Sequence, residues 1–296
     1  ELPARWGPMQ RSKNTAIYLA IRFVVALLRC LPRFVLRSLG AALGTLAAWV
    51  VRSEVSRAMD HLKVAFPDLT PREARRTVRQ MFVALAHSAM DALVLERVIL
   101  DTGIPDSARA LFEDALSEGR GVVAVSGHIG NWELCAQSIA AAGFPLSVIA
   151  SPTYDPRLTR LIHGFRSRNG AQVLWRGDRT VGKDMLRVFK RNQVLAMLID
   201  QDTKVQGAFV PFFGKPAHTP IAAAQLALRF KAPIIVGFVY HHHGDYRYVF
   251  ERFPYPEDST AEELTALLTQ RIEDAIREEP AQWVWFHKRW KTQQAG

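Results

Sequence analysis

One stretch of the sequence places a histidine and a carboxylate at a spacing suited to proton transfer. His128 is followed five residues later by Glu133, within the segment Gly127-His-Ile-Gly-Asn-Trp-Glu133. An imidazole titrates near neutral pH, and a carboxylate that folds back onto it fixes its tautomer and stabilises its protonated form. Such a pair can remove the proton of a hydroxyl group as that hydroxyl attacks an electrophile. The segment therefore predicts general-base chemistry, with His128 as the base and Glu133 as its partner.

The elements on either side are expected to place this pair at the end of a strand. Residues 122–125 form a short β-branched run, which is typical of a fully buried strand. Residues 132–142 have the pattern of a helix, and Asn131 is suited to be its N-cap. In open parallel sheets, ligands bind at the carboxyl ends of the strands. We therefore expect His128 to lie in a binding cleft.

Strand and helix patterns alternate along most of the chain. This alternation predicts an α/β fold, with a mostly parallel sheet flanked by helices on both faces. A capping box at Thr70–Glu73 predicts the start of an earlier helix. The expected strands are residues 122–125, 146–150, 172–175, 194–199, 233–240 and 246–253. The expected helices are residues 70–97, 105–119, 132–142, 156–169, 180–191, 220–231 and 259–279.

The first 60 residues are both apolar and basic. They carry nine Lys or Arg against three acids, within a chain whose net charge is +10. Arginines and Pro32 interrupt the apolar region 17–51, so a clean membrane span is not predicted. Apolar helices with spaced arginines suit an anionic membrane surface, and the alternative is a helical hairpin that covers the core. We expect a helical membrane-associated region at residues 1–60 and a catalytic domain at residues 61–296.

Other features of the sequence argue against several classes of protein. The glycines around His128 make neither a dinucleotide-binding fingerprint nor a P-loop, and Ser126 lies in no nucleophile elbow. The sequence has no zinc-ligand spacing and no signature of a nucleic-acid-binding domain. We therefore expect no metal, no cofactor and no nucleic-acid partner. Cys30 and Cys135 do not indicate a disulfide framework and fit a reducing compartment.

The segment from His128 to Glu133 resembles the H-x4-D/E motif of glycerolipid-type acyltransferases. It is most similar to the late acyltransferases of lipid A biosynthesis, the LpxL/HtrB-like group within the lysophospholipid acyltransferase superfamily. The resemblance extends through residues 166–170, 199–202, 211–216 and 283–290, and so over essentially the whole chain.

This resemblance implies an αβα sandwich and an activity. The expected reaction moves a fatty acyl chain from an acyl carrier protein or CoA thioester to a hydroxyl of a membrane glycolipid. In lipid A synthesis that hydroxyl belongs to a 3-hydroxyacyl chain of a phosphorylated precursor. The implied location is the cytoplasmic face of the bacterial inner membrane.

The resemblance also implies substrate-binding residues. Arg166 and Asp200 match positions that the family uses in its site, and Arg168 is suited to grip an acceptor phosphate. Asn131, inside the motif, is a further substrate-binding candidate. The tetrahedral intermediate needs donors for its oxyanion, and the candidates are the backbone N–H groups of residues 130–132 or one of the two arginines. Plainer alternatives are a cap residue for Asp200 and a solvated helix face for the arginines.

The catalytic motif does not identify the acceptor, because it acts only on the hydroxyl and the thioester. A phosphatidylinositol mannoside, a lysophospholipid or an ornithine lipid is an alternative acceptor. A thioesterase or hydrolase of the same fold class is a more distant alternative. An acidic carrier protein, a phosphorylated lipid and an anionic membrane surface would each account for the basic charge.

Overall fold

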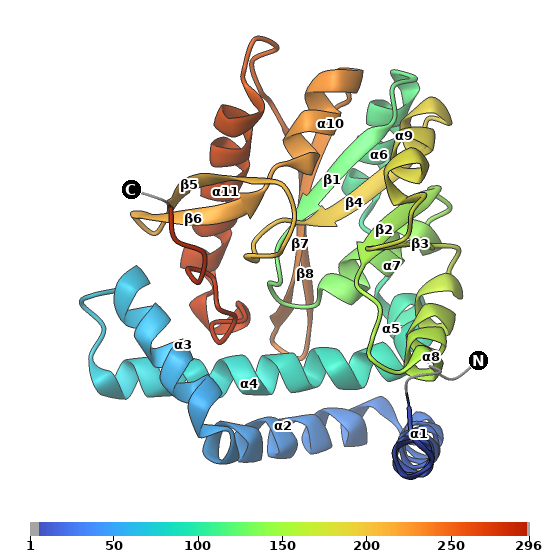
Figure 1. Cartoon of the computed structure of the whole chain (residues 1–296), viewed down its shortest axis with the longest axis vertical. Coiled ribbons are helices and arrows are strands. Elements are labelled where there is room, and N and C mark those ends of the chain that lie inside the picture. The colour runs from blue at the N-terminus through green and yellow to red at the C-terminus, as the bar shows by residue number, and fades with distance from the viewer. Residues whose placement is uncertain (1–5, 295–296) are drawn as a thin grey trace.

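A mostly parallel sheet forms the centre of the molecule (Figure 1). The computed structural model describes residues 6–294, and in this part of the chain the strands of the main sheet lie in the order β3-β2-β4-β1-β7-β8. All neighbours are parallel except β7 and β8. The α/β prediction is therefore confirmed, and the strands lie close to their expected positions. They are β1 (Val122–Ser126), β2 (Leu146–Ala150), β3 (Gln172–Trp175), β4 (Val194–Leu198), β7 (Ile234–His242) and β8 (Asp245–Phe253).

Helices cover both faces of this sheet, because alternate residues of each strand point to opposite sides. In β1, Val122 and Ala124 pack with Phe112 of α6, whereas Val123 and Val125 belong to the core on the other face. The helices of the first face are α6 (Asp106–Ser117) and α7 (Trp132–Ala141). Those of the second face are α9 (Val181–Lys190), α10 (Ala222–Phe230) and α11 (Ala261–Glu278). A further helix, α8 (Pro156–Ser167), follows β2 and packs against β3.

A second, two-stranded sheet was not expected from the sequence. β5 (Gly207–Phe212) and β6 (Lys215–Pro220) pair in antiparallel fashion and pack against α11. The turn between them consists of Phe213 and Gly214, which both have positive φ angles, 49° and 71°. Positive φ angles at two successive residues are typical of a tight hairpin turn. Prolines inside both strands conceal the strand pattern in the sequence.

The amino-terminal part of the described chain is helical. Its helices are α1 (Pro8–Arg29), α2 (Arg33–Val50), α3 (Arg52–Ala65), α4 (Pro71–Leu93) and α5 (Leu95–Thr102). The capping box predicted at Thr70–Glu73 is present at the start of α4. The single helix expected over residues 70–97 is wrong, because the chain leaves the helical conformation at Val94, with φ −125° and ψ 28°.

α2 packs closely along α4, and α3 and α4 join the main core. A side chain at Gly44 would lie 2.6 Å from the carbonyl oxygen of Phe82, so glycine permits this close approach. Leu62 of α3 and Val78 of α4 belong to the same buried cluster as Val123 of β1. Residues 1–5 of the region expected to associate with a membrane lie outside the described residues.

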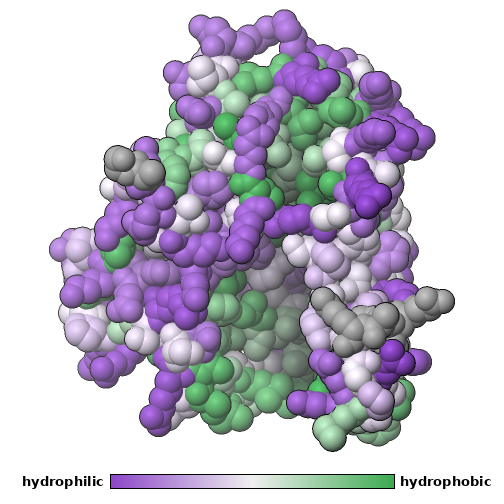
Figure 2. All heavy atoms as spheres, viewed as in Figure 1, coloured by the Kyte–Doolittle hydropathy of each residue, from purple (hydrophilic) through white to green (hydrophobic). Residues whose placement is uncertain are grey.

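α1 and α2 expose apolar side chains. Phe23 is 70% exposed and Trp49 is 76% exposed, and Phe34 and Val50 are similarly open to solvent. Figure 2 shows apolar surface along the lower edge of the molecule, where α2 lies. Within residues 6–294 no single helix has the length and apolar composition of a membrane span. In this described part of the chain, only α2 and α3 taken together, with a bend of 87° between them, meet that criterion.

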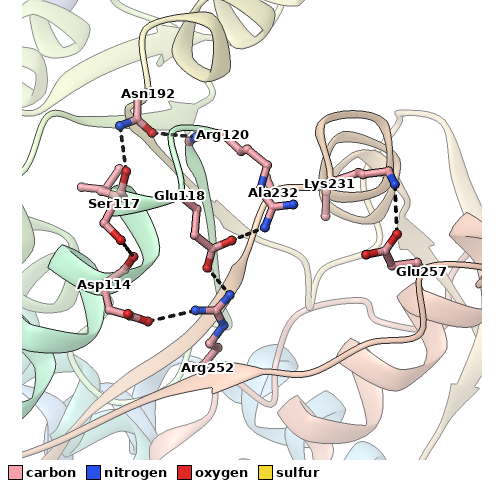
Figure 3. Close-up of polar contacts among 12 residues, drawn as sticks. Asp114, Ser117, Glu118, Arg120, Asn192, Lys231, Ala232, Arg252 and Glu257 are labelled. Atoms are coloured by element: carbon pink, nitrogen blue, oxygen red, sulfur yellow. Dashed lines mark hydrogen bonds and ion pairs between the residues drawn. The ribbon is translucent and has the colours of Figure 1, made fainter.

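Polar contacts hold the amino end of β1, at the opposite end of the strand from the predicted site (Figure 3). Arg252 of β8 contacts Asp114 at 3.0 Å and also pairs with Glu118, which in turn pairs with Arg120. Asn192 accepts a hydrogen bond at 2.9 Å from the backbone N–H of the glycine that precedes β1. These contacts join α6, β1 and β8 at the amino end of β1. Exposed ion pairs of this kind each contribute little to stability.

Candidate active site

A cavity of about 650 Å³ lies at the carboxyl ends of β1, β2 and β4. Its lining is mainly apolar, but His128, Glu133 and Arg166 all contribute to it. Ser126, Ala150 and the loop after β4 form part of the same wall, so the cavity lies where α/β sheets bind their ligands.

The imidazole of His128 is hydrogen-bonded to the carboxylate of Asp200. The distance from His128 Nδ1 to Asp200 Oδ1 is 2.8 Å, and the backbone N–H of His128 donates to Asp200 Oδ2 at 2.7 Å. The pairing of β1 with β4 explains this proximity. Ser126 lies opposite Leu198 in this parallel pair, so the residues two positions beyond each of them also meet. Glycine at position 127 leaves room, because a Cβ there would lie 3.2 Å from Asp200 Cγ.

Asp200 is ionised despite its burial. Its side chain lies inside the protein, with a residue exposure of 2%. Burial by itself would raise the pKa of the carboxyl group, but the charge of His128 and hydrogen bonds from His128 and Trp283 outweigh it and lower the pKa to about 2. A neutral imidazole that donates from Nδ1 to this carboxylate has its free lone pair on Nε2. That nitrogen is then the one able to accept a proton.

Glu133 makes a different contact from the one expected. Arg166 Nε donates to Glu133 Oε2 at 3.0 Å, and the terminal Nη2 of the same guanidinium contacts Oε1. This is a two-bond ion pair between α7 and α8, with about a quarter of each side chain exposed. The carboxylate at His128 Nδ1 is therefore Asp200 and not Glu133. Trp132, which precedes Glu133 in the sequence, packs its ring against the imidazole of His128, with the two ring centroids 5.0 Å apart.

Asn131 and Arg168 bond to protein groups. Asn131 is fully buried, and its Oδ1 accepts a hydrogen bond at 3.0 Å from the backbone N–H of Leu134, as expected of an N-cap. Its Nδ2 donates to the hydroxyl of Tyr246 at 3.2 Å. Arg168 lies on the surface beside α5, where its guanidinium is 3.5 Å from Glu96. The side chain of Asn131 is therefore occupied by contacts within the protein, whereas that of Arg168 is 39% exposed and does not belong to the cavity lining.

Two of the three backbone N–H groups expected to stabilise an oxyanion are also occupied. The N–H of Gly130 donates to the carbonyl of Gln282 at 2.8 Å, and that of Asn131 donates to the carbonyl of Val239 at 2.8 Å. Gly130 has a φ of +56°, and a Cβ there would lie 2.1 Å from the oxygen of Val239. The loop therefore requires glycine at this position for packing. Of the residues expected to supply donors, Trp132 and Arg166 both line the cavity.

Trp283 is a member of the site that the sequence reasoning did not single out. Its indole Nε1 donates to Asp200 Oδ2 at 2.8 Å. It follows the short 3₁₀ helix Pro280–Gln282, and its backbone forms an isolated bridge with Ile129. Nearby, His287 Nε2 accepts from the backbone N–H of Asp202 at 3.1 Å, and burial lowers the pKa of His287 to about 4. The carboxyl-terminal segment thus packs against one side of residues 127–131, the catalytic loop, which carries His128.

The arrangement can perform general-base chemistry on a substrate with an apolar part. It contains a histidine oriented by a buried carboxylate, a neighbouring arginine held by a second carboxylate, and a mainly apolar cavity. Within residues 6–294 no group of three or more His, Cys, Asp or Glu side chains is arranged to hold a metal ion.

Comparisons with known proteins agree with this chemistry. The chain is 25% identical over 277 residues to the lipid A biosynthesis lauroyltransferase of Escherichia coli K12, covering 90% of this chain and 88% of that protein. It is 24% identical over 289 residues to the lipid A biosynthesis palmitoleoyltransferase of the same strain, with the same coverage. A phosphatidylinositol mannoside acyltransferase of Mycolicibacterium smegmatis is 27% identical over 182 residues, covering 60% of this chain and 59% of that protein.

A family model covers almost the entire chain. The model described as bacterial lipid A biosynthesis acyltransferase matches residues 8–292, which include the catalytic loop, the cavity and Trp283. The chain is therefore an acyltransferase and belongs to the bacterial lipid A biosynthesis acyltransferase family.

Proposed function

We propose that this acyltransferase moves a fatty acyl chain from an acyl carrier protein thioester to a hydroxyl of a lipid A precursor. The observation that carries the proposal is the His128–Asp200 pair in a mainly apolar cavity. The choice of acceptor is supported by coverage, since the lauroyltransferase aligns over 88% of its length but the mannoside enzymes over 56% to 59%. A mannoside acceptor is the second candidate, and CoA is the alternative donor.

In the proposed reaction, His128 Nε2 takes the proton of the acceptor hydroxyl as its oxygen attacks the thioester carbonyl. The tetrahedral intermediate then collapses, the carbon–sulfur bond breaks and the new ester forms. The imidazolium returns its proton to the departing thiolate, so that the products are an ester and a thiol. The carboxylate of Asp200 keeps the proton of the neutral imidazole on Nδ1 and stabilises the imidazolium. No covalent acyl-enzyme is required.

In this proposal the ion pair of Glu133 and Arg166 serves the substrate. A guanidinium has five N–H donors, and two of them face Glu133, so others remain for an anionic group in the cavity. Two bonds to one carboxylate hold the planar guanidinium in a defined orientation. We assign Arg166 to the oxyanion or to a phosphate of the substrate, and Glu133 to the positioning of Arg166.

We assign the acyl chain to the part of the cavity between the sheet and α7. Ala124 and Ala196, which lie on neighbouring strands, are small enough to leave space on this face. Phe112 of α6 and Phe250 of β8 line its far end, with ring centroids 5.6 Å apart. Gly237 makes room for the Phe250 ring, because a Cβ there would lie 2.5 Å from it. The two phenylalanines would therefore limit the length of the chain.

We further propose that residues 1–60 associate with the cytoplasmic face of the bacterial inner membrane, while residues 61–296 form the catalytic domain. The exposed apolar side chains of α1 and α2, among them Phe23 and Trp49, support this assignment. The excess of Lys and Arg in the same region supports binding to an anionic leaflet. A lipid acceptor would then reach the site without leaving the membrane.

An acceptor panel tests this proposal. The purified protein in detergent is given acyl carrier protein thioesters of several chain lengths, together with a lipid A precursor, a phosphatidylinositol mannoside or a lysophospholipid. We expect an ester product on the lipid A precursor and a much lower rate with the other acceptors. Product on the phosphatidylinositol mannoside alone would make that lipid, and not the lipid A precursor, the acceptor. Free fatty acid as the sole product would indicate a thioesterase.

A further inference from the structure

The carboxylate of Asp200 accepts hydrogen bonds from two residues. His128 supplies two of them, Nδ1 to Oδ1 at 2.8 Å and the backbone N–H to Oδ2 at 2.7 Å. Trp283 supplies the third, from its indole Nε1 to Oδ2 at 2.8 Å. Both Asp200 and Trp283 are almost completely buried, so water does not readily replace these bonds.

Trp283 is held firmly by its surroundings. Its ring packs edge-on against Trp285, with centroids 4.6 Å apart, and against Phe212, with centroids 5.5 Å apart. Its backbone bridges to Ile129, the residue after the catalytic histidine. The indole N–H therefore presents a fixed donor to the carboxylate, and the same segment supports the loop that carries His128.

We propose that Trp283 is a positioning residue, which acts on His128 by fixing the orientation of the Asp200 carboxylate. This inference rests on the proposed function of the His128–Asp200 pair. The terminal torsion of an aspartate has a broad energy minimum, so hydrogen bonds decide which oxygen faces which partner. With two donors on Oδ2, the other oxygen is left to face Nδ1 of His128.

The indole dipole also acts electrostatically on the pair. Its positive end points at the carboxylate and lowers the attraction of that carboxylate for an imidazolium. Loss of the indole N–H therefore changes this attraction as well as the orientation of the carboxylate. Among the described residues, two further titratable groups whose charges interact with Asp200 are His287 and Arg289. His287 accepts from the backbone N–H of Asp202, and Arg289 donates to the hydroxyl of Thr219.

The chain offers a matched control in Trp285. This residue is also fully buried and its indole Nε1 also donates a hydrogen bond, but to the carbonyl of Pro280 at 2.6 Å. Replacement of either tryptophan by phenylalanine removes an indole N–H and leaves an aromatic ring in the core. Only Trp283→Phe removes a donor from Asp200.

The experiment compares Trp283→Phe and Trp285→Phe with the wild type. Thermal unfolding measures how much stability each variant loses. Steady-state kinetics measures the effect of each substitution on kcat and KM. We expect Trp283→Phe to lower kcat about tenfold, the order expected for loss of a hydrogen bond to a charged group, with KM values close to wild type. Trp285→Phe should keep the wild-type kcat and KM.

A second readout does not depend on acyl transfer. The Nδ1 proton of His128, which lies in the hydrogen bond to Asp200, is followed by NMR in protein with labelled histidine. We expect Trp283→Phe to broaden this proton signal, with no such change in Trp285→Phe. Unchanged signals and kcat in Trp283→Phe, or equal effects of both variants, would overturn the inference. Absence of transfer by the wild type, with the expected NMR changes, would instead refute the proposed function.

Discussion

Replacement of Asp200 by asparagine distinguishes the two carboxylates near His128. Two donors, the His128 backbone N–H and the Trp283 indole, converge on Asp200 Oδ2. The amide oxygen of the introduced asparagine must therefore occupy that position, and its NH₂ group then faces Nδ1 of His128. Nδ1 would have to accept this hydrogen bond, so the proton of the neutral imidazole would move to Nε2. A base protonated at the reacting nitrogen cannot take a proton from the acceptor.

The expected loss of activity is large. The surroundings of Asp200 lower its pKa from 3.8 to about 2, which corresponds to about 2 kcal/mol of stabilisation of the carboxylate. The wrong tautomer adds to the loss of this charge, and the same change in a serine protease triad lowers kcat by about 10⁴. We expect Asp200→Asn to lower kcat by about 10³ to 10⁴ while the KM values change little.

The matched variant is Glu133→Gln, which keeps the size of the side chain and weakens the pair with Arg166. His128 keeps its partner in this variant, so we expect a loss of only about tenfold in kcat/KM. This loss falls on KM if Arg166 binds a substrate phosphate and on kcat if it stabilises the oxyanion. Initial rates with an acyl carrier protein thioester, measured by mass spectrometry of the lipid product, compare the two, and thermal unfolding checks the fold. A larger loss in Glu133→Gln than in Asp200→Asn would refute this reasoning and restore Glu133 as the partner of His128.

Three further predictions follow from other parts of the structure. Phe250→Ala should raise kcat/KM for acyl chains longer than the wild-type optimum, by up to about fourfold for each additional buried methylene. An unchanged preference in a panel of chain lengths would show that Phe250 does not limit the length of the acyl chain. Trp49→Ser should weaken binding to anionic phospholipid vesicles about tenfold, because this exposed side chain would be buried in the interface, and unchanged cosedimentation would argue against that surface. The low pKa of Asp200 contributes stability that is complete above about pH 4 and is lost as the pH falls toward 2, so urea unfolding of Asp200→Asn over that range should depend less on pH than that of the wild type.

Local signals in the sequence were sufficient to predict most of the helices and strands. The β-branched run of β1 and the capping box at Thr70 depend on residues that are close in the chain. Their physical causes are therefore visible in a short window of sequence. The hairpin of β5 and β6 was missed because Pro211 and Pro216 interrupt the pattern of a strand.

The partner of His128 depends instead on strand order. β4 follows β3 in the chain but lies between β2 and β1 in the sheet, and this order brings Asp200 beside His128. Glu133 is nearer in sequence, but it lies on the first turn of α7 and reaches Arg166 on α8. A separation of five residues was thus a weaker guide than the register between two parallel strands. Trp283 was missed for the same reason, since its contact with Asp200 spans 83 residues.

The most direct test of the central claim measures acyl transfer to a lipid A precursor by the wild type and by His128→Ala. Both proteins are purified in detergent and given the same acyl carrier protein thioester, and the lipid product is identified by mass spectrometry. We predict that the wild type adds one acyl chain in ester linkage to a hydroxyl of the precursor, and that His128→Ala, although folded, forms at most a trace of this product. Equal amounts of product from the two proteins would contradict the assignment of His128 as the base.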